Sequence, residues 1–147
     1  MLNHILANFY ERDLRKFVEE IKLFKDEASL WKTHGSIKNS SGNLALHIIG
    51  GLNFFVGDKL AQTGYIRNRN EEFSQKNVPR ENILAAFEEL IPMVKRTLNG
   101  LTDHQLENAF PIPFDDAPNS TGYVLVTLLA HVNYHLGQVN YLRRMQE

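Results

Sequence analysis

The sequence predicts an all-α protein, a four-helix bundle in which residues 1–147 form one domain. Three observations support this. Apolar residues recur with helical periodicity in four segments, no segment alternates apolar and polar residues as a strand does, and 147 residues suit a single hydrophobic core. Four helices that each carry one apolar stripe bury those stripes most simply by closing into a bundle.

The first predicted helix covers residues 2–27, because its apolar residues recur at i, i+3 and i+4. Those residues are Leu2, Ile5, Leu6, Phe9, Leu14, Phe17, Val18, Ile21 and Phe24. A connection rich in turn and capping residues follows, and the second helix is expected over residues 43–61. Gly50 and Gly51 inside that helix each cost about 1 kcal/mol relative to alanine. They are tolerable there if small residues make room for a ligand or for a closely packed helix.

The third predicted helix begins at Pro79, a residue suited to a first helical turn, and ends at Gly100. Pro92 lies inside it and is expected to kink it. A connector of about 20 residues follows, and connectors of that length often lie across the mouth of a site. The last helix runs to about Met145 and is apolar over a wide arc. Such a helix is either central to the bundle or buried by a partner chain, so a monomer and a homodimer are equally compatible with it.

Composition excludes several classes of protein. Sixteen basic and seventeen acidic residues give a net charge of -1, so no basic face for nucleic acid is expected. The absence of cysteine excludes disulfides, thiolate ligands and a cysteine nucleophile. The N-terminal residues lack the pattern of a secretory signal, and no apolar run suggests a membrane span. We therefore expect a cytoplasmic protein that binds neither nucleic acid nor membrane.

Three histidines occupy positions that suit a metal site. His131 and His135 are four residues apart on the last helix, so their side chains project from one face. His47 lies in the second helix, on a face that also carries core residues. A histidine pair at this spacing is more often an ordinary hydrogen-bonded pair, and the third histidine strengthens the case for a metal. The motifs of di-iron centres, covalent haem and zincin proteases are all missing. A mononuclear three-histidine site with open coordination positions remains.

This combination resembles the DinB/YfiT-like superfamily. The resemblance spans nearly the whole chain and rests on three phrases, residues 39–47, 67–73 and 131–138. It implies an up-down bundle with a crossover connection and frequent homodimers. It also implies a divalent metal ion, such as nickel, zinc or iron, held by His47, His131 and His135. Relatives in that superfamily include thiol-dependent transferases and isomerases.

Two functions of different classes are compatible with these residues. In the first, the protein is an enzyme whose metal activates water or a thiol. The thiol would be an external low-molecular-weight one, and the enzyme an S-transferase or a related hydrolase or isomerase. Arg67 and Arg69 are candidate clamps for a substrate carboxylate, and Gln138 is a candidate polar group near the metal. Glu72 is a candidate base, or a partner that orients a ligating imidazole.

In the second, the protein is a non-catalytic dimer that binds a metal or a small molecule. The loop that carries the two arginines and the glutamate is then a surface cluster of salt bridges that stabilises its own fold.

Overall fold

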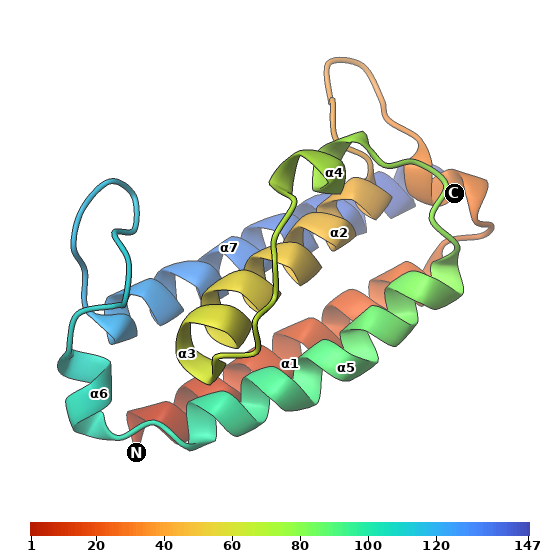
Figure 1. Cartoon of the computed structure of the whole chain (residues 1–147). Coiled ribbons are helices and arrows are strands. Elements are labelled where there is room, and N and C mark those ends of the chain that lie inside the picture. Colours follow the sequence, from red (N-terminus) through yellow and green to blue (C-terminus); the bar gives the residue numbers. More distant parts are fainter.

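Four long helical segments run side by side in the computed structural model, which describes residues 1–147 (Figure 1). The all-α class predicted from the sequence is confirmed, since the chain forms no strand. The long segments are α1 (Leu2–Leu23), α2 (Ser41–Leu52) with a π-helical turn (Asn53–Asp58) and α3 (Lys59–Ala61), α5 (Arg80–Asn99) and α7 (Thr121–Arg144). Short elements complete the chain: a 3-10 helix (Ala28–Trp31), α4 (Arg69–Ser74) and α6 (Asp103–Glu107).

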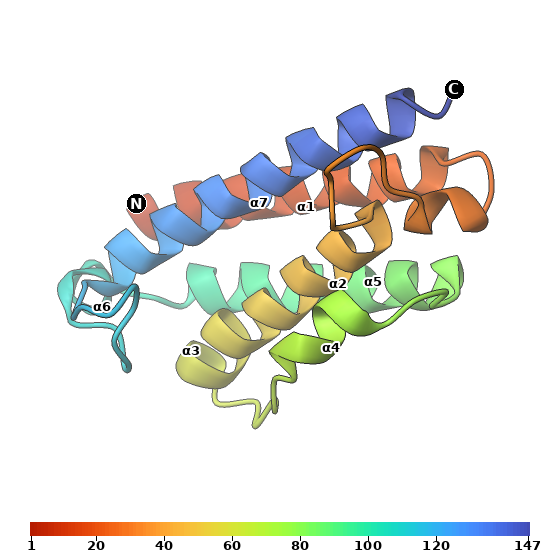
Figure 2. The same ribbon diagram turned by 90° about the horizontal axis from the view of Figure 1, so that it is seen from above.

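The four long segments form a closed ring of contacts. Helix α1 packs against α5 and α7, and α2 packs against the same two helices. Helices α1 and α7 run in one direction, and α2 and α5 run in the other (Figure 1). Because α2 and α5 are parallel, the chain between them crosses back along the length of the bundle. This crossover, residues 62–79, lays α4 against α2 in both views (Figure 2).

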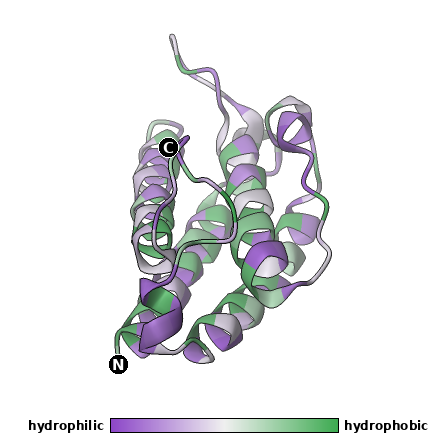
Figure 3. Cartoon of the chain, turned by 60° about the vertical axis from the view of Figure 1, so that its left-hand side comes forward, coloured by the Kyte–Doolittle hydropathy of each residue, from purple (hydrophilic) through white to green (hydrophobic).

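The core is a single cluster of 30 buried apolar residues. Figure 3 shows apolar and polar residues on opposite sides of the helices, as expected when each stripe turns inward. Phe17 of α1 and Phe87 of α5 stack with ring centroids 5.4 Å apart. A polar contact also joins α1 to α7, because the exposed Asn133 donates to the carboxylate of the buried Asp13 over 2.7 Å. These contacts fix the height of α7 in the bundle, and with it the height of the two histidines that α7 carries.

Several predicted boundaries differ from the structure. Helix α1 ends at Leu23, four residues before the predicted end, and a 3-10 helix follows. The second helix starts two residues earlier than expected, because the Ser40 side chain accepts from the Asn43 backbone N–H and caps it. The segment at 67–73, expected to be a loop, overlaps α4 (Arg69–Ser74). Helix α5 begins at Arg80, one residue after the predicted start, and contains Pro92 as predicted.

One segment, Ser41–Ala61, is long and apolar enough to cross a membrane by length and composition alone. The sequence predicts no such segment. In the structure it packs against α4, α5 and α7, the surroundings of a bundle's core helix. A buried core helix passes the same test of length and composition, so the finding is weak evidence for a membrane span.

Candidate metal centre

The three predicted histidines converge in the structure. The Nε2 atom of His131 lies 2.9 Å from Nε2 of His135 and 3.3 Å from Nε2 of His47. The ligand atoms that the three rings offer all lie within 4.8 Å of one another. His47 comes from α2 and the other two from α7, so the packing of α2 on α7 builds the cluster. Two helices far apart in sequence thus aim three ring nitrogens at one point.

Hydrogen bonds on the far side of two rings determine which nitrogen carries the proton. His47 places Nδ1 3.0 Å from the Glu72 carboxylate, and His135 places Nδ1 2.7 Å from the side-chain oxygen of Gln138. Both oxygens are acceptors, so each Nδ1 carries its proton and donates it. At His47 the 3.0 Å bond to Glu72 is shorter than the 3.4 Å approach of Arg67 Nη2 to the same nitrogen, so the carboxylate decides the tautomer. The Nε2 atoms of those rings then present lone pairs toward His131. This is the arrangement that orients metal-ligating histidines in proteins.

A buried ion pair holds Glu72 in place. Arg67 donates to both carboxylate oxygens, from Nε over 2.8 Å and from Nη2 over 2.9 Å. The Glu72 residue is only 6% exposed, which an unpaired carboxylate would not tolerate. Room for it comes from Gly50 of α2. A Cβ atom at Gly50 would lie 1.9 Å from Oε2 of Glu72, so α2 can accept the carboxylate only where it has no side chain. Gly50 thus has a packing reason at this position.

Asn43 attaches α4 to α2. It lies on the first turn of α2, and its side-chain NH₂ group donates to the carbonyl oxygens of Glu72 and Gln75 over 3.0 and 2.8 Å. Its side-chain oxygen accepts from Lys76 and from Ser40. The residue is fully buried, so these bonds are shielded from water. Glu72 and Phe73 of this segment therefore pack against His47, while residues 68–71 remain exposed.

Burial lowers the pKa of all three histidines, and loss of hydration is the largest cause for each. The effect is greatest for His131, where burial and the charges of its histidine and arginine neighbours lower the pKa to about 4. Glu72 opposes the effect at His47 by hydrogen bonding and charge, but the direction remains downward. The rings are therefore uncharged at neutral pH, and their unprotonated nitrogens are free to act as ligands.

The donor set fits a divalent metal ion. In a tetrahedral site with metal–nitrogen bonds of about 2.0–2.1 Å, neighbouring ligand nitrogens lie about 3.3 Å apart. The observed separations of 2.9 and 3.3 Å are close to that value. Three neutral imidazoles suit zinc, nickel or iron, and three protein ligands leave coordination positions open.

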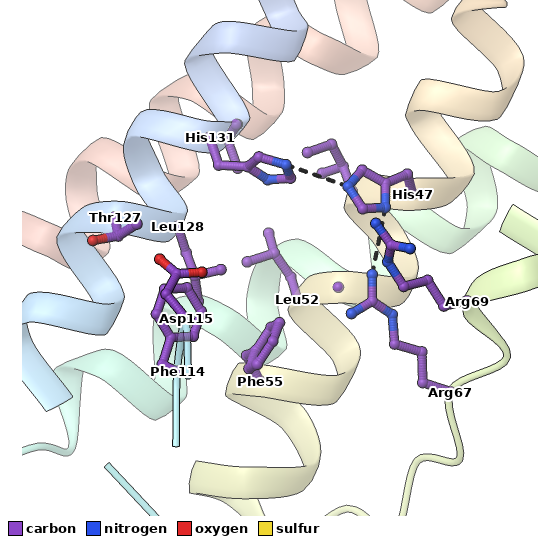
Figure 4. A pocket seen from close by; sticks show the side chains of 13 residues that line it. His47, Leu52, Phe55, Arg67, Arg69, Phe114, Asp115, Thr127, Leu128 and His131 are labelled. Carbon is purple, nitrogen blue, oxygen red and sulfur yellow. Dashed lines mark hydrogen bonds between the residues drawn. The ribbon is translucent and has the colours of Figure 1, made fainter. Parts of the chain in front are cut away.

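A cavity of about 340 Å³ adjoins the cluster, and His47 and His131 line it (Figure 4). Its apolar wall comes from α2, the π-helical turn, α7 and the connector before α7. The residues of that wall are Ile48, Leu52, Phe55, Phe114, Leu128 and Val132. Both predicted arginines, Arg67 and Arg69, line the cavity as well. Arg67 is occupied by its ion pair with Glu72, whereas Arg69 forms no ion pair and its guanidinium carbon lies 5.2 Å from the centroid of the Phe73 ring.

The positions of the remaining candidates bear on their roles. Both oxygens of Glu72 are engaged, which favours the orienting role over that of a base. Gln138 faces a second cavity, of about 430 Å³, on the other side of His135. Asp115, which the sequence analysis does not single out, lines the first cavity opposite the arginines (Figure 4). The long proline-rich connector was the available signal, since such connectors often border a site.

Comparison with known proteins identifies related chains. A family model described as a protein of unknown function, DUF1572, matches residues 3–147. The crystal structure of a DinB-like protein from Bacillus cereus has a TM-score of 0.70 and 19% identity, covering 91% of this chain and 85% of that one. A conserved protein from Enterococcus faecalis has a TM-score of 0.72 and 17% identity, covering 95% and 94%. None of the curated proteins compared with this chain matches it. At these identities the two structures show a shared fold.

Proposed function

The chain belongs to the DUF1572 family, a DinB-like family, and from this premise we propose that it is a divalent-metal-dependent enzyme. His47, His131 and His135 hold the metal. One observation carries the proposal: three Nε2 atoms converge beside a cavity that two of the same rings line. A structural site would be closed by a fourth protein ligand. Here the three ligands adjoin a space large enough for a small molecule.

The proposed reaction uses an external low-molecular-weight thiol as the nucleophile. When bound, the metal would lower the pKa of a coordinated thiol or water and make it nucleophilic at neutral pH. The chain has no cysteine, so the sulfur has to arrive with a substrate. In the S-transferase reaction the thiolate forms a carbon–sulfur bond to an electrophile and displaces its leaving group, and the thiol proton passes to solvent. A hydrolase or isomerase would use the same centre with water or with the thiol as a cofactor.

The chain's own residues orient the metal-binding rings and bind the substrate. Glu72 and Gln138 keep two rings in the tautomer whose Nε2 is a ligand. Arg67 holds Glu72 and neutralises its charge. Arg69 has a free guanidinium at the cavity and can pair with an anionic group of the substrate. The apolar wall excludes water from part of the cavity, which strengthens these polar contacts.

Elemental analysis of natively purified protein tests the metal, and thiol transfer tests the enzyme. We expect about one metal ion per chain in the wild type and none in His135→Ala, with the circular dichroism of both unchanged. Equal metal content in the two proteins would overturn the metal site. A screen of the metal-loaded protein with an electrophile and a panel of thiols should show turnover that His135→Ala lacks. Stoichiometric metal without turnover would favour the non-catalytic binder instead.

We also propose that the protein is a homodimer that pairs through α7. Residues Thr121–Leu142 contain no Asp, Glu, Lys or Arg, although one face of the helix is exposed. Tyr123, Val126, Tyr134 and Tyr141 on that face are each more than half exposed. An exposed helix face normally carries charge, and tyrosines are enriched at interfaces. The cytoplasmic location expected from the sequence stays a prediction.

A further inference from the structure

We propose that the cavity beside the histidines binds a small zwitterion, with its anionic group at Arg69 and its cationic group at Asp115. The inference rests on the proposed function and names the class of molecule that the site takes. Arg69 comes from α4, in the crossover, and Asp115 comes from the connector between α6 and α7. Both line the same cavity, and Figure 4 shows Asp115 on the side opposite the arginines.

Neither charge at the cavity is compensated by an oppositely charged protein group, although the Arg69 guanidinium lies over the Phe73 ring. None of the ion pairs in the structure includes Arg69 or Asp115, and neither side chain makes a hydrogen bond. Arg67 is different, because Glu72 compensates its charge in full. The cavity therefore has one free positive charge on the α4 side and one free negative charge on the connector side. Apolar side chains such as Leu52 and Phe55 lie between them (Figure 4).

The connector holds Asp115 firmly at the cavity. Phe114 and Ala117 exchange backbone hydrogen bonds of 2.8 and 3.2 Å, and the two residues between them, Asp115 and Asp116, have φ of 53° and 60°. This is a two-residue turn of type I′, which requires positive φ at both central residues and accepts Asp or Asn there. The Phe114 ring packs on the Phe55 ring of the π-helical turn with centroids 5.3 Å apart. The turn is thereby anchored to the second helix.

A zwitterion matches this arrangement better than a singly charged ligand. A ligand that is only an anion would pair with Arg69 but would be repelled by the negative charge of Asp115. A ligand that is only a cation would pair with Asp115 but would be repelled by the positive charge of Arg69. A molecule with a carboxylate and an ammonium group satisfies both side chains and can direct a third group toward His47 and His131, which line the same space. An amino acid whose side chain ends in a thiol has all three groups.

Four thiols of different charge test the inference by binding rather than turnover. The cobalt-loaded protein is titrated with L-cysteine, 3-mercaptopropionate, cysteamine and 2-mercaptoethanol. Binding is followed by calorimetry, and by the thiolate-to-cobalt absorption band. We expect L-cysteine to bind most tightly. Arg69→Gln should weaken the binding of L-cysteine and of 3-mercaptopropionate by about tenfold, which corresponds to the loss of one partly exposed charge-assisted hydrogen bond. The affinity for cysteamine should be unchanged.

The complementary variant is Asp115→Asn, which keeps a residue suited to the turn. It should weaken the binding of L-cysteine and of cysteamine by about tenfold and leave the affinity for 3-mercaptopropionate unchanged. Asp116→Asn alters the same turn outside the cavity and should leave the affinities for all four thiols unchanged. As a further control, the cobalt content of every variant is measured. Equal affinities for all four thiols, or equal losses in each variant, would overturn the zwitterion inference while leaving the thiol function standing.

L-serine distinguishes the opposite failure. It has the two charged groups without the sulfur, and we expect it to bind weakly, with the same dependence on Arg69 and Asp115. Binding of L-serine without a thiolate band for any thiol would refute the thiol function and retain the zwitterion site. If neither L-serine nor L-cysteine binds, the inference is wrong.

Discussion

Replacing Gly50 by alanine tests the packing that positions the metal centre. Alanine is the better helix former and would by itself stabilise α2 by about 1 kcal/mol. However, its Cβ would lie 1.9 Å from Oε2 of Glu72 and 2.6 Å from its Cδ, so the carboxyl group has to move. That group accepts two hydrogen bonds from Arg67 and one from His47. Hydrogen bonds to charged groups contribute about 1.5–3 kcal/mol each, so losing two of them outweighs the gain in helix propensity.

We therefore expect Gly50→Ala to lower the free energy of unfolding by about 2–4 kcal/mol. Urea denaturation of the metal-free protein measures this as a lower midpoint at an unchanged slope. The variant should also bind metal about 10–100-fold more weakly, because the ring of His47 loses the group that orients it. Competition with a coloured chelator measures the affinity.

Gly51→Ala is the matched control. Its Cβ would meet Nη2 of Arg67 at 3.5 Å, an ordinary van der Waals contact. It should raise stability by about 0.5–1 kcal/mol through helix propensity alone and leave metal affinity unchanged. If Gly50→Ala is also more stable than the wild type and binds metal equally well, then the Glu72 side chain can move without any loss of stability or metal affinity. That result would refute the assigned role of the ion pair.

Three further predictions concern the network, the assembly and the titration of the cluster. Glu72→Gln retains the shape but not the charge, so it should lower metal affinity by about 10–100-fold in chelator competition; a change within twofold would contradict this. Ala130→Glu places a charge on the uncharged face of α7 and should convert a dimer to a monomer in light scattering, whereas Ala85→Glu on the exposed face of α5 should not; a dimer that persists in Ala130→Glu excludes that face. The pKa of His131 is lowered to about 4 by burial and neighbouring positive charge, whereas an unfolded histidine titrates near 6.5. Between these values the unfolded chain binds more protons, so the melting temperature of the metal-free protein should fall as pH drops from about 6.5 towards about 4. A melting temperature that is flat over this range would contradict the burial of the ring.

The parts of the fold that follow local rules could be predicted from the sequence. Apolar periodicity located the four long helices, because that periodicity is what a bundle buries. The spacing of His131 and His135 placed both rings on one helix face for the same geometric reason. The π-helical turn at Asn53–Asp58 has no comparable local signal, since its wider hydrogen-bond pattern depends on the packing around it.

The surroundings of the histidines depend on tertiary contacts and could not be predicted in the same way. The phrase around Glu72 is polar and highly charged, the composition of an exposed loop. Glu72 alone is buried, and this becomes possible because Arg67 neutralises the carboxylate, Asn43 fixes the backbone, and Gly50 leaves space. The glycine pair in α2 was a usable signal of close approach, but nothing local identified the group that approaches. In the same way, the two aspartates of the connector predict a turn and not the cavity that one of them lines.

The ion pair between Arg67 and Glu72 determines how much negative charge reaches the cluster. A lone carboxylate beside His47 would make the ring more basic and add negative charge next to the three nitrogens. With Arg67 donating to both of its oxygens, the carboxylate orients the ring while its charge is compensated within the pair. The donors are then three neutral imidazoles, which leave the charge of a bound dication undiminished and available to acidify a further ligand. The same bonds make Glu72 a poor general base, because neither oxygen is free to take a proton from the cavity.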